Sequence, residues 1–234
     1  MLEALRQGEL TLQGQFLSGS NYTYLGTLSY HDTTLQTVYK PVRGEQPLWD
    51  FPAGSLAHRE AAAYVLSAGL GWDLVPPTVY RRRGPIGSGS VQLYIEHNPN
   101  DHFFNFSPED KQRLRPVVLF DLIANNADRK GGHILLGEDR RVWCIDHGLC
   151  FHVEEKLRTV VWDFAGEPIP VDLLADLEKM ESDLVEGQAL HQQMSAHLRP
   201  GEISALAARS RNLRRAGCFP TPSPGRRPYP WPPV

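Results

Sequence analysis

The sequence predicts an α+β protein with two lobes, in which a small antiparallel β-sheet carrying one helix is followed by a mostly helical part. Short runs of alternating apolar and polar residues recur over residues 9–95. A segment rich in turn-forming residues at 97–101 interrupts them, and apolar residues at helical spacing follow. We therefore expect an N-lobe over residues 1–97, a C-lobe over 98–215 and a proline-rich tail over 216–234.

Composition narrows the class of protein. The 234 residues can bury a sizeable core, and a formal net charge of −3 argues against nucleic-acid binding through bulk positive charge. No run approaches the roughly 20 apolar residues of a membrane span, and the N-terminus has no pattern of an export signal. Three cysteines without metal-type spacing are typical of a reduced protein. We expect a cytoplasmic protein without zinc.

Five strands are expected in the N-lobe, because β-favouring residues alternate with polar ones between turn signals. They lie at residues 9–17, 22–30, 35–42, 78–80 and 91–95. The first two form a hairpin whose tip contains Ser20 and Asn21. Such a tip either offers backbone N–H groups to phosphates or is an ordinary turn.

One strand and one helix of the N-lobe carry a lysine and a glutamate of interest. In the strand over 35–42, Lys40 shares a face with two valines, so it either reaches into a cleft or is solvated. A helix is expected over 56–68 with Ser55 as its N-cap. Its Glu60 either pairs with Lys40 or belongs to the solvated face of the helix.

The C-lobe is expected to contain several helices. One begins at Ser107 and runs to about residue 123, with Pro116 kinking or splitting it. Further helices are expected at 170–180, 182–197 and 201–214. The proline-rich tail is extended or disordered. Its Tyr229 and Trp231 either anchor it on the body of the protein, which we favour, or serve a partner.

The chain is organised around two polar loops joined by a hairpin. The first loop, at 124–133, contains Asp128 and His133, and the second begins at Asp146. Between them, residues 134–136 and 141–145 are predicted to pair as strands. The hairpin would bring these three side chains together. An acid that orients a hydroxyl, with two ligands for a divalent ion, is what phosphoryl transfer requires.

The order of these features resembles that of a known family. The glycine-bearing hairpin, strand lysine, helix glutamate and two acid loops follow the layout of a protein-kinase-like fold. The chain resembles small bacterial proteins of the phosphatidylinositol 3-/4-kinase-like group and, more distantly, HipA-type kinases. The resemblance covers about residues 14–170 and the Trp-Pro-Pro ending. Its matching stretches are 38–45, 47–52, 59–60, 75–78, 125–133, 146–148 and 156–159.

The resemblance implies an ATP site with Mg²⁺ or Mn²⁺. Lys40 would hold the α- and β-phosphates, and Glu60 would fix Lys40. Ser20 and Asn21 would lie under the phosphates, and Glu96 would border the adenine pocket.

The resemblance also implies roles in the two acid loops. Asp128 would be the catalytic acid and Asp146 the metal ligand. His133 occupies the position where most relatives have a second metal-binding asparagine. It therefore binds the metal, donates to a phosphate, or leaves the metal to Asn126, and imidazole favours manganese over magnesium. Lys130 would touch the γ-phosphate and take part in catalysis.

Three functions are compatible with the sequence. The preferred one is a kinase that transfers the γ-phosphate of ATP to an unidentified hydroxyl of a protein, small molecule or lipid. The second is a nucleotide-binding pseudokinase or scaffold with a partner for the proline-rich tail. The third is a metal-dependent phosphohydrolase. Its residues would be Asp128, His133, Asp146, His147 and His152.

Overall fold

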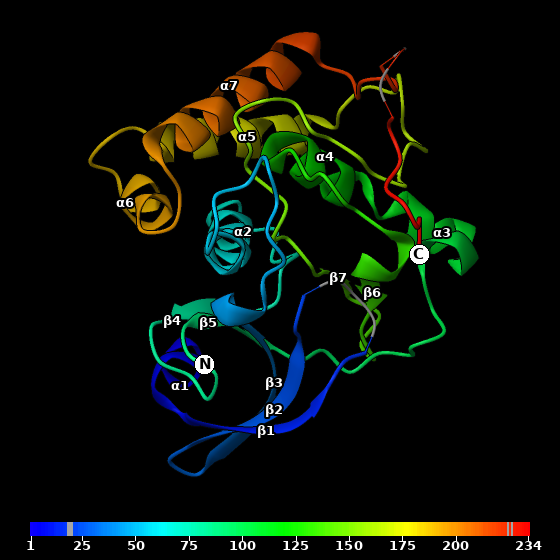
Figure 1. Cartoon of the computed structure of the whole chain (residues 1–234). Coiled ribbons are helices and arrows are strands. Elements are labelled where there is room, and N and C mark those ends of the chain that lie inside the picture. Colours follow the sequence, from blue (N-terminus) through cyan, green and yellow to red (C-terminus); the bar gives the residue numbers. More distant parts are fainter. Residues whose placement is uncertain (18–20, 224, 226) are drawn as a thin grey trace.

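A five-stranded antiparallel sheet forms the N-terminal part of the fold, below the helices in Figure 1. The computed structural model describes residues 1–17, 21–223, 225 and 227–234. The strand order is β1-β2-β3-β5-β4. The elements of this part are α1 (Leu2–Gln7), β1 (Glu9–Gln15), β2 (Tyr24–Tyr30), β3 (Thr33–Pro41), η1 (Val42–Gly44), α2 (Leu56–Gly69), β4 (Thr78–Arg81) and β5 (Gly89–Leu93).

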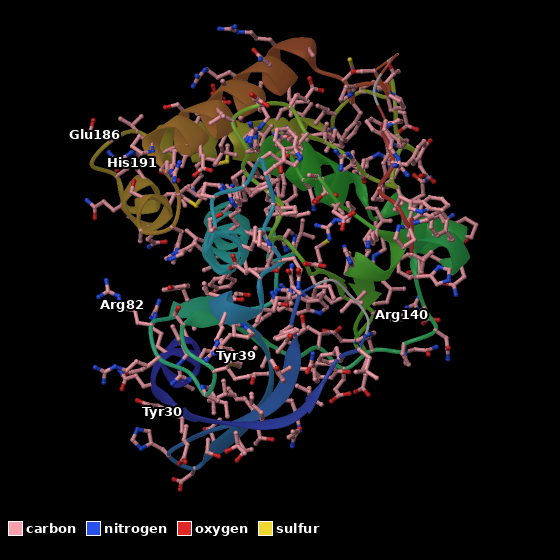
Figure 2. All side chains as sticks on the ribbon, in the orientation of Figure 1. Tyr30, Tyr39, Arg82, Arg140, Glu186 and His191 are labelled. Atoms are coloured by element: carbon pink, nitrogen blue, oxygen red, sulfur yellow. The ribbon has the colours of Figure 1, made fainter. Side chains whose placement is uncertain are left out.

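Helix α1 was not expected from the sequence. Its six residues are too few to show a helical period. Ala4 and Leu5 are nevertheless buried, and they share a small core with Leu28, Tyr39 and Val91 of the sheet. Figure 2 shows Tyr39 inside this part of the protein. Burial against the sheet, rather than helix propensity, therefore stabilises α1.

The C-terminal part is mostly helical, which together with the sheet confirms the expected fold class (Figure 1). Its elements are η2 (Phe103–Asn105), α3 (Pro108–Gln112), α4 (Arg115–Ala124), η3 (Gly131–His133), β6 (Ile134–Leu136), β7 (Val142–Cys144), α5 (Val171–Asp183), α6 (Ala189–Ser195) and α7 (Pro200–Ala216). Among the described helices, none is both long enough and apolar enough to cross a membrane.

Prolines and a turn shorten two of the expected helices. Pro116 lies in the first turn of α4, so the helix expected from Ser107 is split into α3 and α4. The helix expected over 182–197 is wrong in its bounds, because α5 continues to Asp183 and a turn precedes the shorter α6.

Arg140, labelled in Figure 2 at the β6–β7 turn, pairs with Asp110 of α3.

The cap of α2 also differs from expectation. The Ser55 side chain makes no capping bond to the helix. Instead, Oε1 of Glu45 accepts a hydrogen bond of 3.1 Å from the backbone N–H of Ala57. A glutamate from a preceding loop thus satisfies one of the free N–H groups at the helix start. Because Glu45 is distant in sequence, no local pattern predicted it.

The C-terminal tail docks on the body, but not through its aromatic side chains. The carbonyl of Pro228 accepts from the Thr159 N–H at 3.0 Å, and that of Pro233 accepts from the Gly131 N–H at 2.7 Å. Tyr229 and Trp231 are 48% and 75% exposed. The expectation of aromatic anchors is therefore wrong, because backbone carbonyls attach the chain. Figure 1 shows the tail descending from α7 towards α3.

A histidine pair links α2 to the segment between α6 and α7. Nδ1 of His58 lies 3.3 Å from Nδ1 of His197, and the His58 ring stacks on Tyr80 with ring centroids 3.7 Å apart. Burial lowers the pKa of His58, and burial together with electrostatic interactions with His58 and Arg6 lowers the pKa of His197 to about 4. Both rings are therefore neutral in the folded protein at neutral pH.

The pair predicts a loss of stability in acid. The unfolded protein binds protons at these histidines below the ordinary pKa of about 6.5. In the folded protein the pKa of His58 is lower than this, and His197 resists protonation until about pH 4. After discounting for partial exposure, His197 should contribute about 1 kcal/mol to the loss between pH 7.5 and 5. Thermal unfolding of wild type and His197→Gln at both pH values measures it. Equal pH dependence in the two proteins would contradict the assignment.

Candidate active site

Lys40 and Glu60 form an ion pair between the sheet and the helix that packs on it. Lys40 lies near the end of β3, and its Nζ donates to Oε1 of Glu60 in α2 at 2.5 Å. The other carboxylate oxygen of Glu60 accepts from the backbone N–H of His147 at 3.0 Å. Of the two alternatives left open by the sequence, the structure has the paired one. Glu60 thereby joins β3 to the loop that follows β7.

Asp146 is the third member of this cluster. Its Oδ1 accepts from Nζ of Lys40 at 3.0 Å. Its backbone has φ +61°, a left-handed conformation that aspartate tolerates better than most residues. Burial alone would lower the pKa of Lys40, but the carboxylates of Asp146 and Glu60 outweigh it and raise the pKa. Lys40 is therefore firmly protonated, and it holds Asp146 as an anion.

The second oxygen of Asp146 faces His133. Oδ2 of Asp146 lies 3.3 Å from Nε2 of His133. Nδ1 of the same ring lies 3.1 Å from the carbonyl oxygen of Asp128. Burial lowers the pKa of His133 to about 4, although Asp146 opposes the shift. The ring is therefore neutral and carries one proton. With the ring proton on Nδ1, the ring donates to the Asp128 carbonyl, and the lone pair of Nε2 faces Oδ2 of Asp146, where a cation would relieve the repulsion. With the proton on Nε2, the ring donates to Oδ2 of Asp146, and Nδ1 accepts from the Lys130 N–H at 3.4 Å.

Asp128 lies in the same loop with an altered acidity. Burial raises the pKa of Asp128 to about 6, the charge of Asp146 adds to this, and Lys130 opposes it. Nζ of Lys130 lies 3.6 Å from Oδ2 of Asp128. A carboxylate of this pKa is still mostly ionised near neutral pH and is a stronger base than an ordinary aspartate. The backbone N–H of Asp128 is held by Oδ1 of Asn126 at 2.9 Å.

Asn126 does not fit the metal-binding role expected for it. Its side chain is fully buried, and Nδ2 donates to Oδ1 of Asp121 at 3.0 Å while Oδ1 accepts from Asp128. Both polar atoms are therefore already hydrogen-bonded, one to α4 and one within the loop. We correct its role to that of a residue that positions the Asp128 backbone.

A buried ion pair that sequence reasoning missed supports both loops. Nε and Nη2 of Arg129 donate to the carboxylate of Asp121 in α4 at 2.9 Å. Nη1 donates to the carbonyls of His133 and Ile145 at 3.2 and 2.8 Å. One guanidinium thus connects the end of the first loop to the start of the second. An aspartate inside the apolar helix 115–124 was the available signal, because a buried acid needs a partner.

Among the described residues, the others expected to contact the nucleotide form no hydrogen bond or ion pair with Lys40, Glu60 or Asp146. Asn21 uses its Oδ1 to accept from the Gln46 N–H at 2.7 Å, so it ties the first hairpin to the loop after β3. Glu96 is exposed in the segment after β5. Ser20 lies outside the described residues.

Of the three histidines named for a phosphohydrolase, His133 lies beside Asp146, but His147 and His152 bond elsewhere. Nε2 of His147 lies 2.7 Å from Nη2 of Arg129, and Nε2 of His152 lies 3.0 Å from the carbonyl oxygen of Asp50. Across the part of the chain that the structure describes, no group of three His, Cys, Asp or Glu side chains is arranged to hold a metal ion. His147 and His152 therefore do not face Asp146, which leaves Asp128, His133 and Asp146 of the residues named for the phosphohydrolase alternative.

Solved structures share this arrangement of sheet, helices and loops, and two of them are described as kinases. The Golgi casein kinase, described with Mn/ADP bound, has a TM-score of 0.56 and 14% identity, covering 96% of this chain and 79% of its own. The Helicobacter pylori proinflammatory kinase CtkA has a TM-score of 0.54 and 12% identity, covering 92% and 94%. A structure of hydra Fam20 with sugar has a TM-score of 0.60 and 14% identity, covering 92% and 86%. The chain therefore has a protein-kinase-like fold.

Sequence comparison gives the family. Protein Rv2133c of Mycobacterium tuberculosis is 40% identical over an alignment of 263 positions, which covers 97% of this chain and 93% of the relative. The chain belongs to the family of Rv2133c. Phosphatidylinositol 4-kinase gamma 4 of Oryza sativa is 29% identical over 153 residues, covering 56% of this chain and 27% of the rice protein. This distant similarity confirms the resemblance inferred from the sequence. No protein-family model matches the chain.

Proposed function

We propose that the protein is an ATP-dependent phosphotransferase that moves the γ-phosphate to a hydroxyl acceptor. The observation that carries the proposal is the meeting of Lys40, Glu60 and Asp146 around one ammonium group. A lysine held by a helix glutamate beside a loop aspartate is the arrangement by which kinases bind phosphates and their metal. The kinase-like fold and the distant similarity to a phosphatidylinositol 4-kinase support it.

Each residue of the cluster has a role in this proposal. Lys40 binds phosphate oxygens of ATP and offsets their charge, and Glu60 orients it. Asp128 accepts a hydrogen bond from the acceptor hydroxyl and takes its proton as the new O–P bond forms and the bond to the β-phosphate breaks. Lys130, next to Asp128, stabilises charge on the transferring phosphate. ADP and the phosphorylated acceptor are the products.

A divalent metal fits the donor atoms of Asp146 and His133. A carboxylate oxygen and an imidazole nitrogen lie 3.3 Å apart, and phosphate oxygens of the nucleotide would supply further ligands. When bound, the metal neutralises charge on the β- and γ-phosphates. Because one donor is an imidazole, we expect Mn²⁺ to serve at least as well as Mg²⁺. The Golgi casein kinase structure is likewise described with Mn/ADP.

A thermal-shift titration tests the nucleotide site. ATP with Mn²⁺ or Mg²⁺ should stabilise the wild type, by about 2.7 kcal/mol when free ligand is a hundredfold above Kd. Asp146→Asn should lose the metal-dependent part, because a neutral amide is a poor ligand for a hard cation. Asp32→Asn, in the exposed β2–β3 turn, is the matched control and should respond like wild type.

Two results would contradict the proposal. One is the absence of any shift with nucleotide and either metal in the wild type. The other is an unchanged metal-dependent shift in Asp146→Asn.

A further inference from the structure

Arg59, the residue before Glu60 in α2, is a buried cation next to the cluster of Lys40, Glu60 and Asp146. Its side chain is 2% exposed, and each of its three guanidinium nitrogens has an acceptor. Nη1 donates to the carbonyl of Cys150, Nη2 to Oε1 of Glu202, and Nε to Oγ of Ser55 at 3.4 Å. Two of these acceptors belong to the C-terminal part. Arg59 therefore joins α2 to the other half of the fold.

Glu202, the anionic partner of Arg59, is itself fixed at the start of α7. Its Oε2 accepts from the backbone N–H of Arg199 at 2.8 Å, a bond that caps the helix. Both carboxylate oxygens are thus used, one by α7 and one by Arg59. Figure 1 shows α2 between the sheet and the helices of the C-terminal part. The ion pair anchors α2 to a helix of 17 residues.

Two successive residues of α2 bond to the second acid loop. Arg59 donates to the Cys150 carbonyl, and Glu60 accepts from the His147 N–H at 3.0 Å. Successive side chains point in different directions around a helix, so this turn of α2 is held on two sides. Packing of α2 on β4 brings the helix to the sheet, but apolar contacts are not directional, whereas the donors of a planar guanidinium are. The bonds of Arg59 are therefore suited to fix where Glu60 lies.

We propose that Arg59 is a positioning residue, which keeps Glu60 paired with Lys40 before any nucleotide binds. It does so by tying one turn of α2 to α7 and to the loop that begins at Asp146. Without this tie, Glu60 is free to leave the ammonium group to Asp146 alone. The consequence for ATP rests on the proposed function: the ATP-dependent thermal shift decreases, because Lys40 is no longer oriented. The pairing itself is tested without ATP.

The acetylation rate of Lys40 in the full chain without nucleotide tests the inference. Only the neutral amine reacts with N-hydroxysuccinimide acetate. Burial lowers the pKa of Lys40, but the carboxylates of Asp146 and Glu60 outweigh it and raise the pKa, so acetylation of wild type at about pH 9 should be slow. Arg59→Met, which keeps an unbranched apolar stem, should raise the rate at least threefold. Glu60→Gln weakens the pair directly and should raise it too. Peptide mass spectrometry measures the modification.

A double variant keeps the test decisive if Arg59→Met does not fold. Arg59→Met alone leaves the carboxylate of Glu202 buried and unpaired, whereas Arg59→Met with Glu202→Met removes both charges. The double variant still lacks the bond to the Cys150 carbonyl. It should also raise the acetylation rate of Lys40 at least threefold.

A matched control separates positioning from a general loss of stability. Phe219→Ala removes a buried ring that packs on Phe164 and leaves a cavity. It destabilises the fold but keeps the bonds of Arg59 and Glu60, so Lys40 should be acetylated like wild type.

The inference is wrong if Arg59→Met and the double variant are both acetylated at Lys40 like wild type. It is also wrong if Phe219→Ala raises the rate as much as Arg59→Met does, because any loss of stability would then have the same effect. A wild type without any nucleotide-dependent thermal shift would contradict the proposed function alone, since acetylation is measured without nucleotide.

Discussion

Replacing Asp128 with asparagine is expected to lower ATP turnover at least a hundredfold while leaving ATP binding nearly intact. The asparagine amide retains the shape of the side chain but cannot take a proton, and proton transfer by a positioned base contributes about 10²–10⁴ in rate. Asp128 bonds neither Lys40 nor Asp146 directly, so the metal and phosphate contacts of those residues are retained. The measurement is release of phosphate from ATP with water as acceptor, alongside the thermal shift.

The same variant separates a kinase from a pseudokinase. In a kinase, turnover falls and the ATP-dependent thermal shift persists. In a pseudokinase or scaffold, wild type and Asp128→Asn have the same negligible turnover, and that result would contradict the proposed activity while keeping the nucleotide site. Lys130→Met is the companion variant. It removes the cation 3.6 Å from Asp128 but not the base, so a smaller loss is expected.

Replacing Arg129 with methionine is expected to destabilise the protein by about 3–5 kcal/mol, because it leaves the buried Asp121 carboxylate unpaired. The side chains of both residues are almost fully buried, with 0% and 1% exposed. The carbonyls of His133 and Ile145 would also lose their donor. The free energy of unfolding in urea measures the effect.

A double variant and a surface control sharpen this test. Asp121→Leu with Arg129→Met removes both charges, so its loss should be smaller than the sum of the two single losses. It should not return to wild type, since the two loop carbonyls remain without Arg129. Arg211→Met removes an exposed arginine and should change stability little. A loss below about 1 kcal/mol in Arg129→Met would show that the pair does not support the loops.

Local patterns predicted the elements that depend on neighbouring residues. The five strands and the hairpin between the acid loops followed from alternation and glycine, and Pro116 predicted a kink or a split, of which the structure has the split. Lys40 and Glu60 were identified as candidates, but strand alternation and helix periodicity left open whether they meet. The packing of α2 against the sheet brings them together.

Other features had no local signal. The cap of α2 by Glu45, the attachment of the tail through the carbonyls of Pro228 and Pro233, and the pairing of His58 with His197 each join residues distant in sequence. Asn126 shows the same limit at the site. As a polar residue in a polar loop it was a plausible ligand, and only its bonds to Asp121 and Asp128 revealed that its atoms are already used.

The sequence by itself determined which residues are candidates for the proposed chemistry, because residue type and order along the chain define the strand lysine, the helix glutamate and the two acid loops. The tertiary structure decided which of them are free to act. Hydrogen bonds are satisfied by whatever group folding brings within about 3 Å, and that neighbour is set by the packing of the whole chain. This packing leaves the side chain of Asp146 47% exposed, next to Lys40 and His133. The same packing buries the side chains of Asn126 and Arg129, which hold the two acid loops in place.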